Sequence, residues 1–204
     1  MRWTVLLEFK MRGVSTAALL LTLVAGTPTT LQGAPAAVSP SSIRIDNFGQ
    51  VSPSYYRGAQ PQGQDYADLA ALGVQTVIDL TDGDGEPGEK ALVERAGMAY
   101  VRIPMSTHES VSTAKVAQFL SVVDDAAKQP VYVHCVGGRH RTGVMTAIYR
   151  MTEEGWSADK AFAEMKQYKF GADFLHPEFK TAVYSYRKDV KRAATVTATK
   201  EGGH

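Results

Sequence analysis

The chain has 204 residues, which is enough for one domain with a substantial core and too short for two large domains. It carries 22 Lys and Arg residues against 21 Asp and Glu residues, so its net charge is +1. This balance excludes the broad positive field that is typical of nucleic-acid binding, and we expect no nucleic-acid partner.

The N-terminal segment differs in composition from the rest of the chain. Basic residues precede a short apolar run over residues 14–26, and a stretch rich in small residues and proline follows, with Ala34-Pro35-Ala36 as a candidate cleavage signal. This order is typical of a secretory signal peptide. Because the apolar run is shorter than the roughly 20 residues that cross a bilayer, we expect no stable membrane span and an exported protein, periplasmic or secreted. An uncleaved N-terminal membrane anchor is the alternative.

Composition also divides the rest of the chain. Residues 37–42 belong to a stretch rich in Thr, Ala, Ser and Pro that is typical of a linker, and residues 191–204 are rich in Thr, Ala, Lys and Gly. We therefore predict a signal peptide over residues 1–36, a linker over 37–42, one folded domain over 43–190 and a flexible tail over 191–204.

Apolar runs typical of strands alternate with helical patterns along the predicted domain. The predicted strands are Ile43–Ile45, Tyr55–Arg57, Val74–Leu80, Met98–Ile103 and Pro130–His134. The predicted helices are Asp65–Leu72, Glu89–Ala96, one that Ser112 or Thr113 caps, Thr142–Arg150, one that Ser157 caps, and Pro177 to about Val190. This alternation predicts an α/β fold with a mainly parallel central sheet flanked by helices.

Ligands of such sheets bind beyond the carboxyl ends of the strands. Three predicted segments follow strand ends: the acidic loop Thr81–Gly88, the polar loop Pro104–Val111, and the segment that begins at Cys135. We therefore expect these segments to line one site.

Cys135 is the single cysteine of the chain, and it lies between a predicted strand and a predicted helix. A strand, a glycine-containing loop and a helix start form a cradle for an anion, and the same field favours a thiolate. Arg141 follows on the same loop and offers a planar fork of donors for two phosphate oxygens. A nucleophile and an oxyanion clamp on one loop predict phosphoryl transfer through a cysteinyl phosphate.

Two other interpretations of Cys135 are a small buried hydrophobic residue and a zinc ligand. The adjacent Gly137 and Gly138 suit an anion nest better than a core crossing. No second cysteine exists and the histidine spacing fits no usual zinc pattern, so we expect no metal ligands.

The run His134–Gly143 resembles the H-C-x-x-G-x-x-R-[ST]-G signature of the cysteine-dependent protein tyrosine and dual-specificity phosphatases. It is most similar to the atypical dual-specificity phosphatases of plants and fungi, some of which cleave inositol pyrophosphates. The segments Tyr56–Pro61, Gly73–Leu80 and Gln129–Cys135 resemble this group in the same order, and the resemblance covers about residues 43–187.

The resemblance implies a metal-independent phosphatase without a cofactor. It implies that Cys135 is the nucleophile, that Arg141 binds the phosphate, that Thr142 helps the thiolate leave, and that His134 orders the loop and makes the thiol more acidic. The implied phosphate-binding residues are Val136, Gly137, Gly138, Arg139, His140 and Arg141. The expected substrate is a phosphorylated protein, with phosphotyrosine or phosphoserine, or an inositol phosphate.

The sequence departs from the family pattern at the general acid, since the loop Pro104–Ser110 holds no aspartate. We take Glu109 as the candidate acid, and the open alternatives are His108, Asp79, Asp82 and Asp84. A weak acid favours substrates with a good leaving group, such as aryl phosphates and pyrophosphates.

Three basic residues have two interpretations each. Arg139 and His140 either grip a second phosphate or an acidic peptide, or form plain surface charge. For Arg57 we predict a structural hydrogen-bonding role rather than a substrate contact.

Two alternative functions remain open at this point. One is a phosphate-binding pseudophosphatase that does not cleave its ligand, and the other is a rhodanese-like sulfurtransferase with a persulfide on Cys135. The sequence does not indicate an oligomeric state.

Overall fold

The computed structural model describes residues 38–186. The chain divides into two units, Met1–Pro35 and Ala36–His204, and the described residues all belong to the second unit. The predicted signal peptide over residues 1–36 and the predicted tail over residues 191–204 lie outside the described residues.

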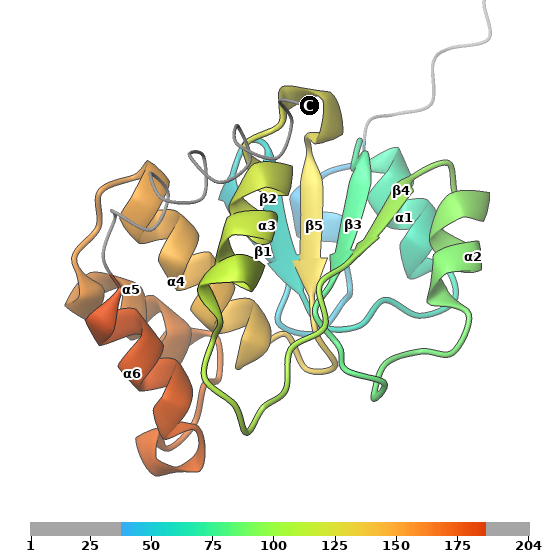
Figure 1. The fold of residues 1–204 in the computed structure, drawn as a ribbon. Helices are drawn as coiled ribbons and strands as arrows, with labels where there is room; N and C mark the ends of the chain where they lie inside the picture. The colour runs from blue at the N-terminus through green and yellow to red at the C-terminus, as the bar shows by residue number, and fades with distance from the viewer. Residues whose placement is uncertain (1–37, 187–204) are drawn as a thin grey trace, which may run out of the picture. The chain divides into compact units, whose positions relative to one another are not determined.

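One five-stranded sheet forms the centre of the domain. Its strands are β1 (Gly49–Ser52), β2 (Tyr55–Gly58), β3 (Thr76–Asp79), β4 (Ala99–Arg102) and β5 (Val131–His134). Their order across the sheet is β1-β2-β5-β3-β4 (Figure 1). Only β1 runs antiparallel to its neighbour, and the pairs β2–β5, β5–β3 and β3–β4 are parallel. The prediction of an α/β fold with a mainly parallel sheet is confirmed.

The first predicted strand is wrong. Ile43–Ile45 is not part of the sheet, although Ile43 and Ile45 are both buried. The two isoleucines on either side of Arg44 are apolar because their side chains pack against the core. Such packing does not require the segment to pair with another strand. The edge strand β1 begins with glycine and holds two further polar residues, so its composition did not identify it.

Within residues 38–186, six helices flank the sheet in the order that the sequence predicts. They are α1 (Asp65–Ala71), α2 (Glu89–Arg95), α3 (Thr113–Val123), α4 (Arg141–Glu153), α5 (Ala158–Gln167) and α6 (Pro177–Ser185), with short 3-10 turns at Pro40–Ser42, Ala126–Lys128 and Asp173–Leu175. The side chains of Ser112 and Ser157 accept hydrogen bonds from the first turns of α3 and α5, as expected of N-caps. The last helix ends at Ser185, before the predicted Val190, because the backbone of Tyr186 is extended. Within residues 38–186, no helix has the length and apolar character needed to cross a bilayer.

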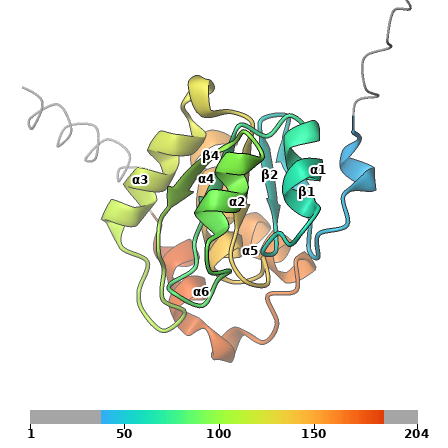
Figure 2. The ribbon, with the colours of Figure 1, turned by 90° about the vertical axis from the view of Figure 1, so that its right-hand side faces the viewer.

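The helices form two layers, with α1 and α2 on one face of the sheet and α3, α4, α5 and α6 on the other (Figures 1 and 2). Leu69 of α1 and Val93 of α2 pack with Tyr132 of β5 in one buried cluster. Phe119 of α3 packs with Val133 of β5 in the other cluster. The central strand thus contributes alternate side chains to the two cores, which is the period of an extended strand.

Because of this alternation, His134, which ends β5, and Cys135, which follows it, face opposite sides of the sheet. Tyr132 and His134 stack on the side of α1 and α2, with ring centroids 5.8 Å apart. Cys135 belongs to the opposite core, with Val131 and Val133. The thiol and the imidazole therefore lie on opposite faces of the sheet.

Candidate active site

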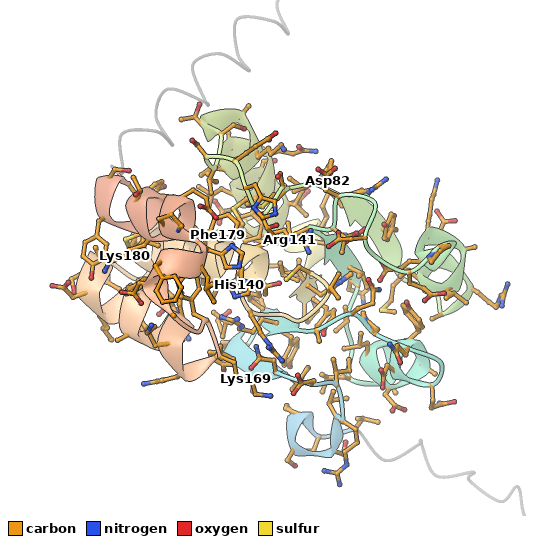
Figure 3. The ribbon with its side chains drawn as sticks, turned by 90° about the horizontal axis from the view of Figure 1, so that it is seen from below. Asp82, His140, Arg141, Lys169, Phe179 and Lys180 are labelled. Carbon is orange, nitrogen blue, oxygen red and sulfur yellow. The ribbon has the colours of Figure 1, made fainter. Side chains whose placement is uncertain are left out.

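The three loops that the sequence places together do meet at the carboxyl end of the sheet. Arg141, at the start of α4, donates from Nη1 and Nη2 to Asp84 in the loop between β3 and α2. Its Nη1 also donates to the carbonyl of Met105, in the loop between β4 and α3, at 3.3 Å. Figure 3 views this edge of the sheet and shows Arg141 between His140 and Asp82 in that view. Arg141 therefore links the loop between β5 and α4, residues 135–140, to both neighbouring loops; we call this segment the cysteine loop.

The carbonyl groups of the cysteine loop are held from outside. The carbonyl of Val136 accepts from the backbone N–H of Gln60 at 3.1 Å. The carbonyl of Gly138 accepts from Arg57 Nη2 at 2.7 Å and from Asn47 Nδ2 at 2.9 Å. Since the N–H of a trans peptide points opposite to its C=O, the N–H groups that follow these carbonyls face the inside of the loop. This is the arrangement of an anion-binding nest.

Position 138 of the loop can hold only glycine. Its φ is +62°, and a Cβ placed there would lie 2.4 Å from the carbonyl carbon and oxygen of Gly58. Both the backbone conformation and the close approach of β2 therefore require glycine.

Cys135 and Arg141 are both buried at the base of this loop, with 3% and 4% of their surfaces exposed. Burial lowers the pKa of Arg141, but the Asp84 carboxylate and the Cys135 sulfur raise it, and the net direction is upward. The guanidinium thus stays charged beside the thiol. This pair fits the predicted nucleophile and phosphate clamp.

Thr142 is fully buried in the first turn of α4. Within residues 38–186, its Oγ1 has no hydrogen-bond partner. The hydroxyl is therefore free to donate to the sulfur of a departing thiolate, which is the role that the family resemblance implies.

Asp84 is an alternative candidate for the general acid that the geometry disfavours. The hydrogen bonds from Arg141 hold the pKa of Asp84 down to about 2, so the carboxyl group carries no proton at neutral pH. Asp79 is also occupied, since it accepts from the backbone N–H and the hydroxyl of Thr81 and from the hydroxyl of Tyr100. The remaining candidates are exposed residues of the two loops: Asp82, His108 and Glu109.

Arg139 and His140 differ in their surroundings. Arg139 is exposed, and its Nη2 lies 3.8 Å from Asp46. The ring of His140 is half-buried, with Nε2 2.9 Å from the carbonyl of Phe170 and its centroid 3.9 Å from that of His176. The first residue belongs to the rim of the site, and the second ties the loop to the segment between α5 and α6.

Two side chains hold the loop from outside: the half-buried Asn47, which sequence reasoning missed, and the buried Arg57. Asn47 has φ +57° and donates to carbonyls of the cysteine loop and of Tyr168. Its only local signal is the preceding Asp46, a pair that is common in turns. Arg57 is fully buried with its guanidinium 3.9 Å above the ring of Tyr168, which agrees with the predicted structural hydrogen bond.

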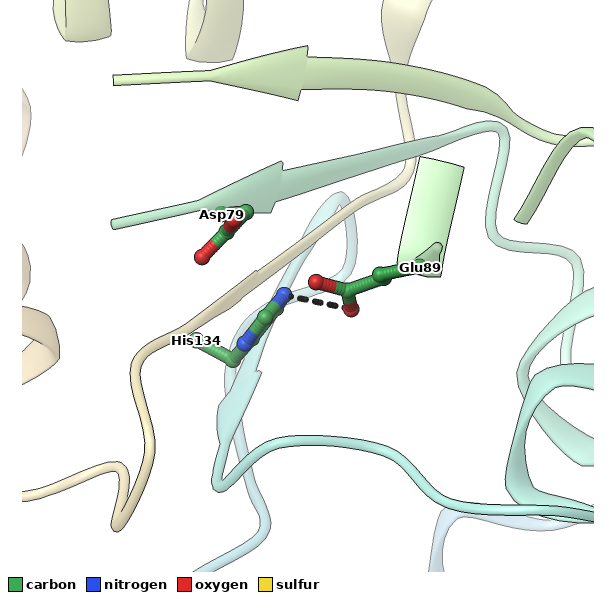
Figure 4. Close-up of side chains that lie close together, drawn as sticks. All are labelled: Asp79, Glu89 and His134. Carbon is green, nitrogen blue, oxygen red and sulfur yellow. Dashed lines mark ion pairs between the residues drawn. The ribbon is translucent and has the colours of Figure 1, made fainter. Parts of the chain in front are cut away.

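His134 faces two carboxylates on the side of the sheet opposite Cys135 (Figure 4). Its Nε2 lies 3.0 Å from Oε1 of Glu89, and one ligand atom from each of Asp79, Glu89 and His134 lies within 4.8 Å of the others. These three buried residues are the side chains that could hold a metal ion among those that the structure describes. Sequence reasoning did not identify Glu89, because nothing in a helix start marks a contact across to β5.

A cavity of about 480 Å³ adjoins the cysteine loop at Val136 and Gly137. Its charged lining residues are Arg44, Asp46, Asp65, Asp84 and Glu86. Carboxylates thus outnumber cationic groups in this part of the rim, although Lys169 pairs with Asp46 at 2.6 Å.

Comparison with known proteins gives a consistent set of relatives. The sequence model of one protein family, described as "DSP-PTPase phosphatase fused to NAD+ Kinase", matches residues 40–181. The dual specificity protein phosphatase TpbA of Pseudomonas aeruginosa is 35% identical over 137 residues, which are 66% of this chain and 58% of TpbA. This chain therefore spans less than two thirds of the length of that relative.

Solved structures show the same fold. The crystal structure of TpbA in complex with phosphotyrosine, with a cysteine replaced by serine, has a TM-score of 0.63 and 30% identity, over 78% of this chain and 94% of that chain. The catalytic core of the inositol pyrophosphate phosphatase SIW14 of Saccharomyces cerevisiae has a TM-score of 0.65 and 22% identity, over 76% of this chain and 95% of that chain.

Proposed function

This chain belongs to the DSP-PTPase phosphatase family, and from that premise we propose that it hydrolyses phosphate monoesters through a cysteinyl-phosphate intermediate, without a metal ion or cofactor at the reacting atoms. The observation that carries the proposal is the loop itself. Cys135 and Arg141 are buried together, and outside hydrogen bonds turn the intervening N–H groups inward.

Substrate binding uses the donors that the fold leaves free. Asp84 takes one edge of the Arg141 guanidinium, between Nη1 and Nη2, while Nε is buried without a partner among the described residues. A phosphate can accept from Nε and from the second proton of Nη2, while its other oxygens accept from the loop N–H groups. Asp84 then orients Arg141 rather than blocking it.

The first chemical step transfers the phosphoryl group to sulfur. The Cys135 thiolate attacks phosphorus, the bond from phosphorus to the ester oxygen breaks, and a general acid delivers a proton to that oxygen. We assign the acid to Glu109, because Asp84 and Asp79 are committed to other partners and the loop of Glu109 contacts Arg141 through Met105. In the second step water attacks phosphorus, the sulfur leaves with a hydrogen bond from Thr142, and Glu109 takes the proton of the water.

For the substrate, we propose an aryl phosphate such as phosphotyrosine in preference to an inositol pyrophosphate. The acidic lining of the neighbouring cavity supports this choice, because it repels a ligand that carries several further phosphates. The phosphotyrosine complex of TpbA, at 30% identity, supports it as well.

The test is turnover of an aryl phosphate and of phosphotyrosine peptides by the full chain, with a chelator present, beside the Cys135→Ser variant. We expect turnover by the parent and none by the variant, which should still bind phosphate. Binding without turnover by the parent would favour the pseudophosphatase. Sulfur transfer from thiosulfate to cyanide would favour the rhodanese-like alternative.

We also propose that the protein is exported, to the periplasm or out of the cell. The basic start, the apolar run over residues 14–26 and the following small residues support this proposal. Fractionation of cells that express the full chain tests it, together with the mass of the mature N-terminus. A full-length protein in the membrane fraction would indicate the anchor instead.

A further inference from the structure

The loop between β4 and α3 carries Glu109 and the alternative acid His108, both exposed. The start of this loop is held to the sheet, because the backbone N–H of Met105 donates to the carbonyl of Leu80 at 3.2 Å. Its end is held at Val111, whose partly buried side chain packs against the core. Neither contact holds the stretch between them, which is the part that carries the two candidate acids.

His176, the residue that precedes α6, contacts this middle stretch. Its Nδ1 lies 3.2 Å from the carbonyl oxygen of Thr107. Among the residues that the structure describes, this is the one hydrogen bond that ties residues 106–110 to another element. Because a carbonyl oxygen only accepts, Nδ1 is the donor. The Oε1 atom of Glu178 also faces Nδ1, at 3.4 Å, and a second oxygen beside Nδ1 favours the hydrogen at that position.

The ring of His176 is itself packed in place. Its side chain is 14% exposed, and its ring centroid lies 3.9 Å from that of His140 and 5.8 Å from that of Phe179. The two flanking residues are labelled in Figure 3, and His140 belongs to the cysteine loop. One imidazole therefore contacts the cysteine loop through its ring and the loop of the candidate acids through Nδ1.

Building on the phosphatase activity proposed above, we propose that His176 is a positioning residue for the general acid: its hydrogen bond to the Thr107 carbonyl holds the loop that presents Glu109. In this role His176 transfers no proton. The proton passes from Glu109 to the leaving oxygen, which requires the two groups to be within hydrogen-bond reach. A loop that is released at Thr107 holds Glu109 within that reach for less of the time.

Two substitutions separate the hydrogen bond from the packing of the ring. His176→Phe keeps an aromatic ring between His140 and Phe179 but removes the donor. His176→Asn loses the ring but keeps an N–H donor at about the distance of Nδ1 along the side chain. The control is Tyr184→Phe, also on α6, which removes the hydrogen bond from a half-exposed hydroxyl to Asp159.

The first measurement is the rate at which a glutamate-specific protease cuts the folded full chain after Glu109, followed by the masses of the fragments. Cleavage requires the loop to leave its folded position, so the rate reports how firmly the loop is held and needs no phosphatase turnover. We expect His176→Phe to be cut about fivefold faster, which is the effect of losing one hydrogen bond. His176→Asn and Tyr184→Phe should be cut at the parent rate.

The second measurement is kcat and KM for an alkyl phosphate and for p-nitrophenyl phosphate. In His176→Phe, we expect kcat for the alkyl phosphate to fall about tenfold, because the poor leaving group depends on a correctly placed acid. KM for both substrates and kcat for p-nitrophenyl phosphate should change little. His176→Asn should restore the parent kcat for the alkyl phosphate.

The proposal is overturned if His176→Phe behaves as the parent while His176→Asn is impaired, because the packing of the ring would then be what matters. Equal effects of the two substitutions would overturn it too, and so would an unchanged kcat for the alkyl phosphate in His176→Phe. An inactive parent with faster cleavage of His176→Phe would refute the phosphatase and retain the hold of His176 on the loop. An active parent with equal cleavage rates for all the variants would do the reverse.

Discussion

Asp84 and Arg141 are joined by two parallel hydrogen bonds, from Nη1 to Oδ1 at 2.9 Å and from Nη2 to Oδ2 at 2.7 Å. The pair fixes the plane of a guanidinium whose side chain is 5% exposed, while the side chain of Asp84 is 51% exposed. A planar fork held along one edge presents its other edge in a fixed direction, which suits it to bind a phosphate.

The Asp84→Asn variant should therefore lose activity. The amide has one acceptor atom in place of two, so it cannot form both parallel hydrogen bonds with Arg141. The guanidinium then loses its fixed orientation, and we expect kcat/KM to fall about tenfold. Steady-state kinetics with an aryl phosphate checks this, with Asp159→Asn on α5 as the control. If Asp84 instead competed with the substrate, the variant would bind phosphate more tightly and kcat/KM would rise.

Gly138 and Gly137 offer a matched pair of substitutions in the loop. A Cβ at Gly138 meets the backbone of β2 at 2.4 Å with φ +62°, whereas the nearest atom to a Cβ at Gly137 is Nε of Arg139 at 3.4 Å. Gly138→Ala should cost more than about 1 kcal/mol of stability and distort the anion nest, because the strain adds to the clash. Gly137→Ala should cost little.

Thermal unfolding of both variants, with and without tungstate as a phosphate mimic, checks this prediction. We expect a lower Tm for Gly138→Ala and no further rise of that Tm with tungstate. Equal Tm values for the two alanine variants would contradict the close approach of β2 to the loop.

Much of the fold was predictable because it depends on local patterns. The strand β5, the glycine loop after Cys135 and the caps Ser112 and Ser157 are contiguous in sequence, and each has a local physical cause. The contacts that hold the loop were not predictable. Asn47 reaches Gly138 across 91 positions, and Asp84 reaches Arg141 across 57 positions.

The same reasoning explains the two errors in the sheet. Ile43 and Ile45 show the alternation of a strand but serve only to fill the core beside α1 and α2. Residues of β1 lack that alternation, and pairing with β2 alone makes Gly49–Ser52 a strand. An edge strand owes its existence to its neighbour more than to its own composition.

His140 predicts a loss of stability in mild acid. Burial, with the nearby charge of His176, lowers the pKa of His140 below its ordinary value of 6.5. Between the two values the unfolded chain binds the proton and the folded chain does not, so stability is full above about pH 6.5 and decreases as the pH falls below it. Replacing His140 with Gln, which does not titrate, should remove this part of the pH dependence.

Tm measured from pH 5 to pH 8 for the parent and for His140→Gln checks the sign. We expect the parent to lose more Tm than the variant between pH 7 and pH 5. Parallel curves would show that folding leaves the pKa of His140 unchanged, and a parent that gains stability in acid would show that folding raises it.

Glu109 is the proposed proton donor, and it lies exposed in the loop between β4 and α3. If it is the general acid, Glu109→Gln should reduce kcat for a poor leaving group, such as an alkyl phosphate, by about 100-fold, while kcat for p-nitrophenyl phosphate changes little. Proton donation by the general acid speeds the reaction only where the leaving oxygen is strongly basic. His108→Gln tests the neighbouring alternative, and the larger selective loss identifies the acid. Equal losses for both substrates in Glu109→Gln would contradict the assignment, because a residue that only supports the loop affects binding of every phosphate alike.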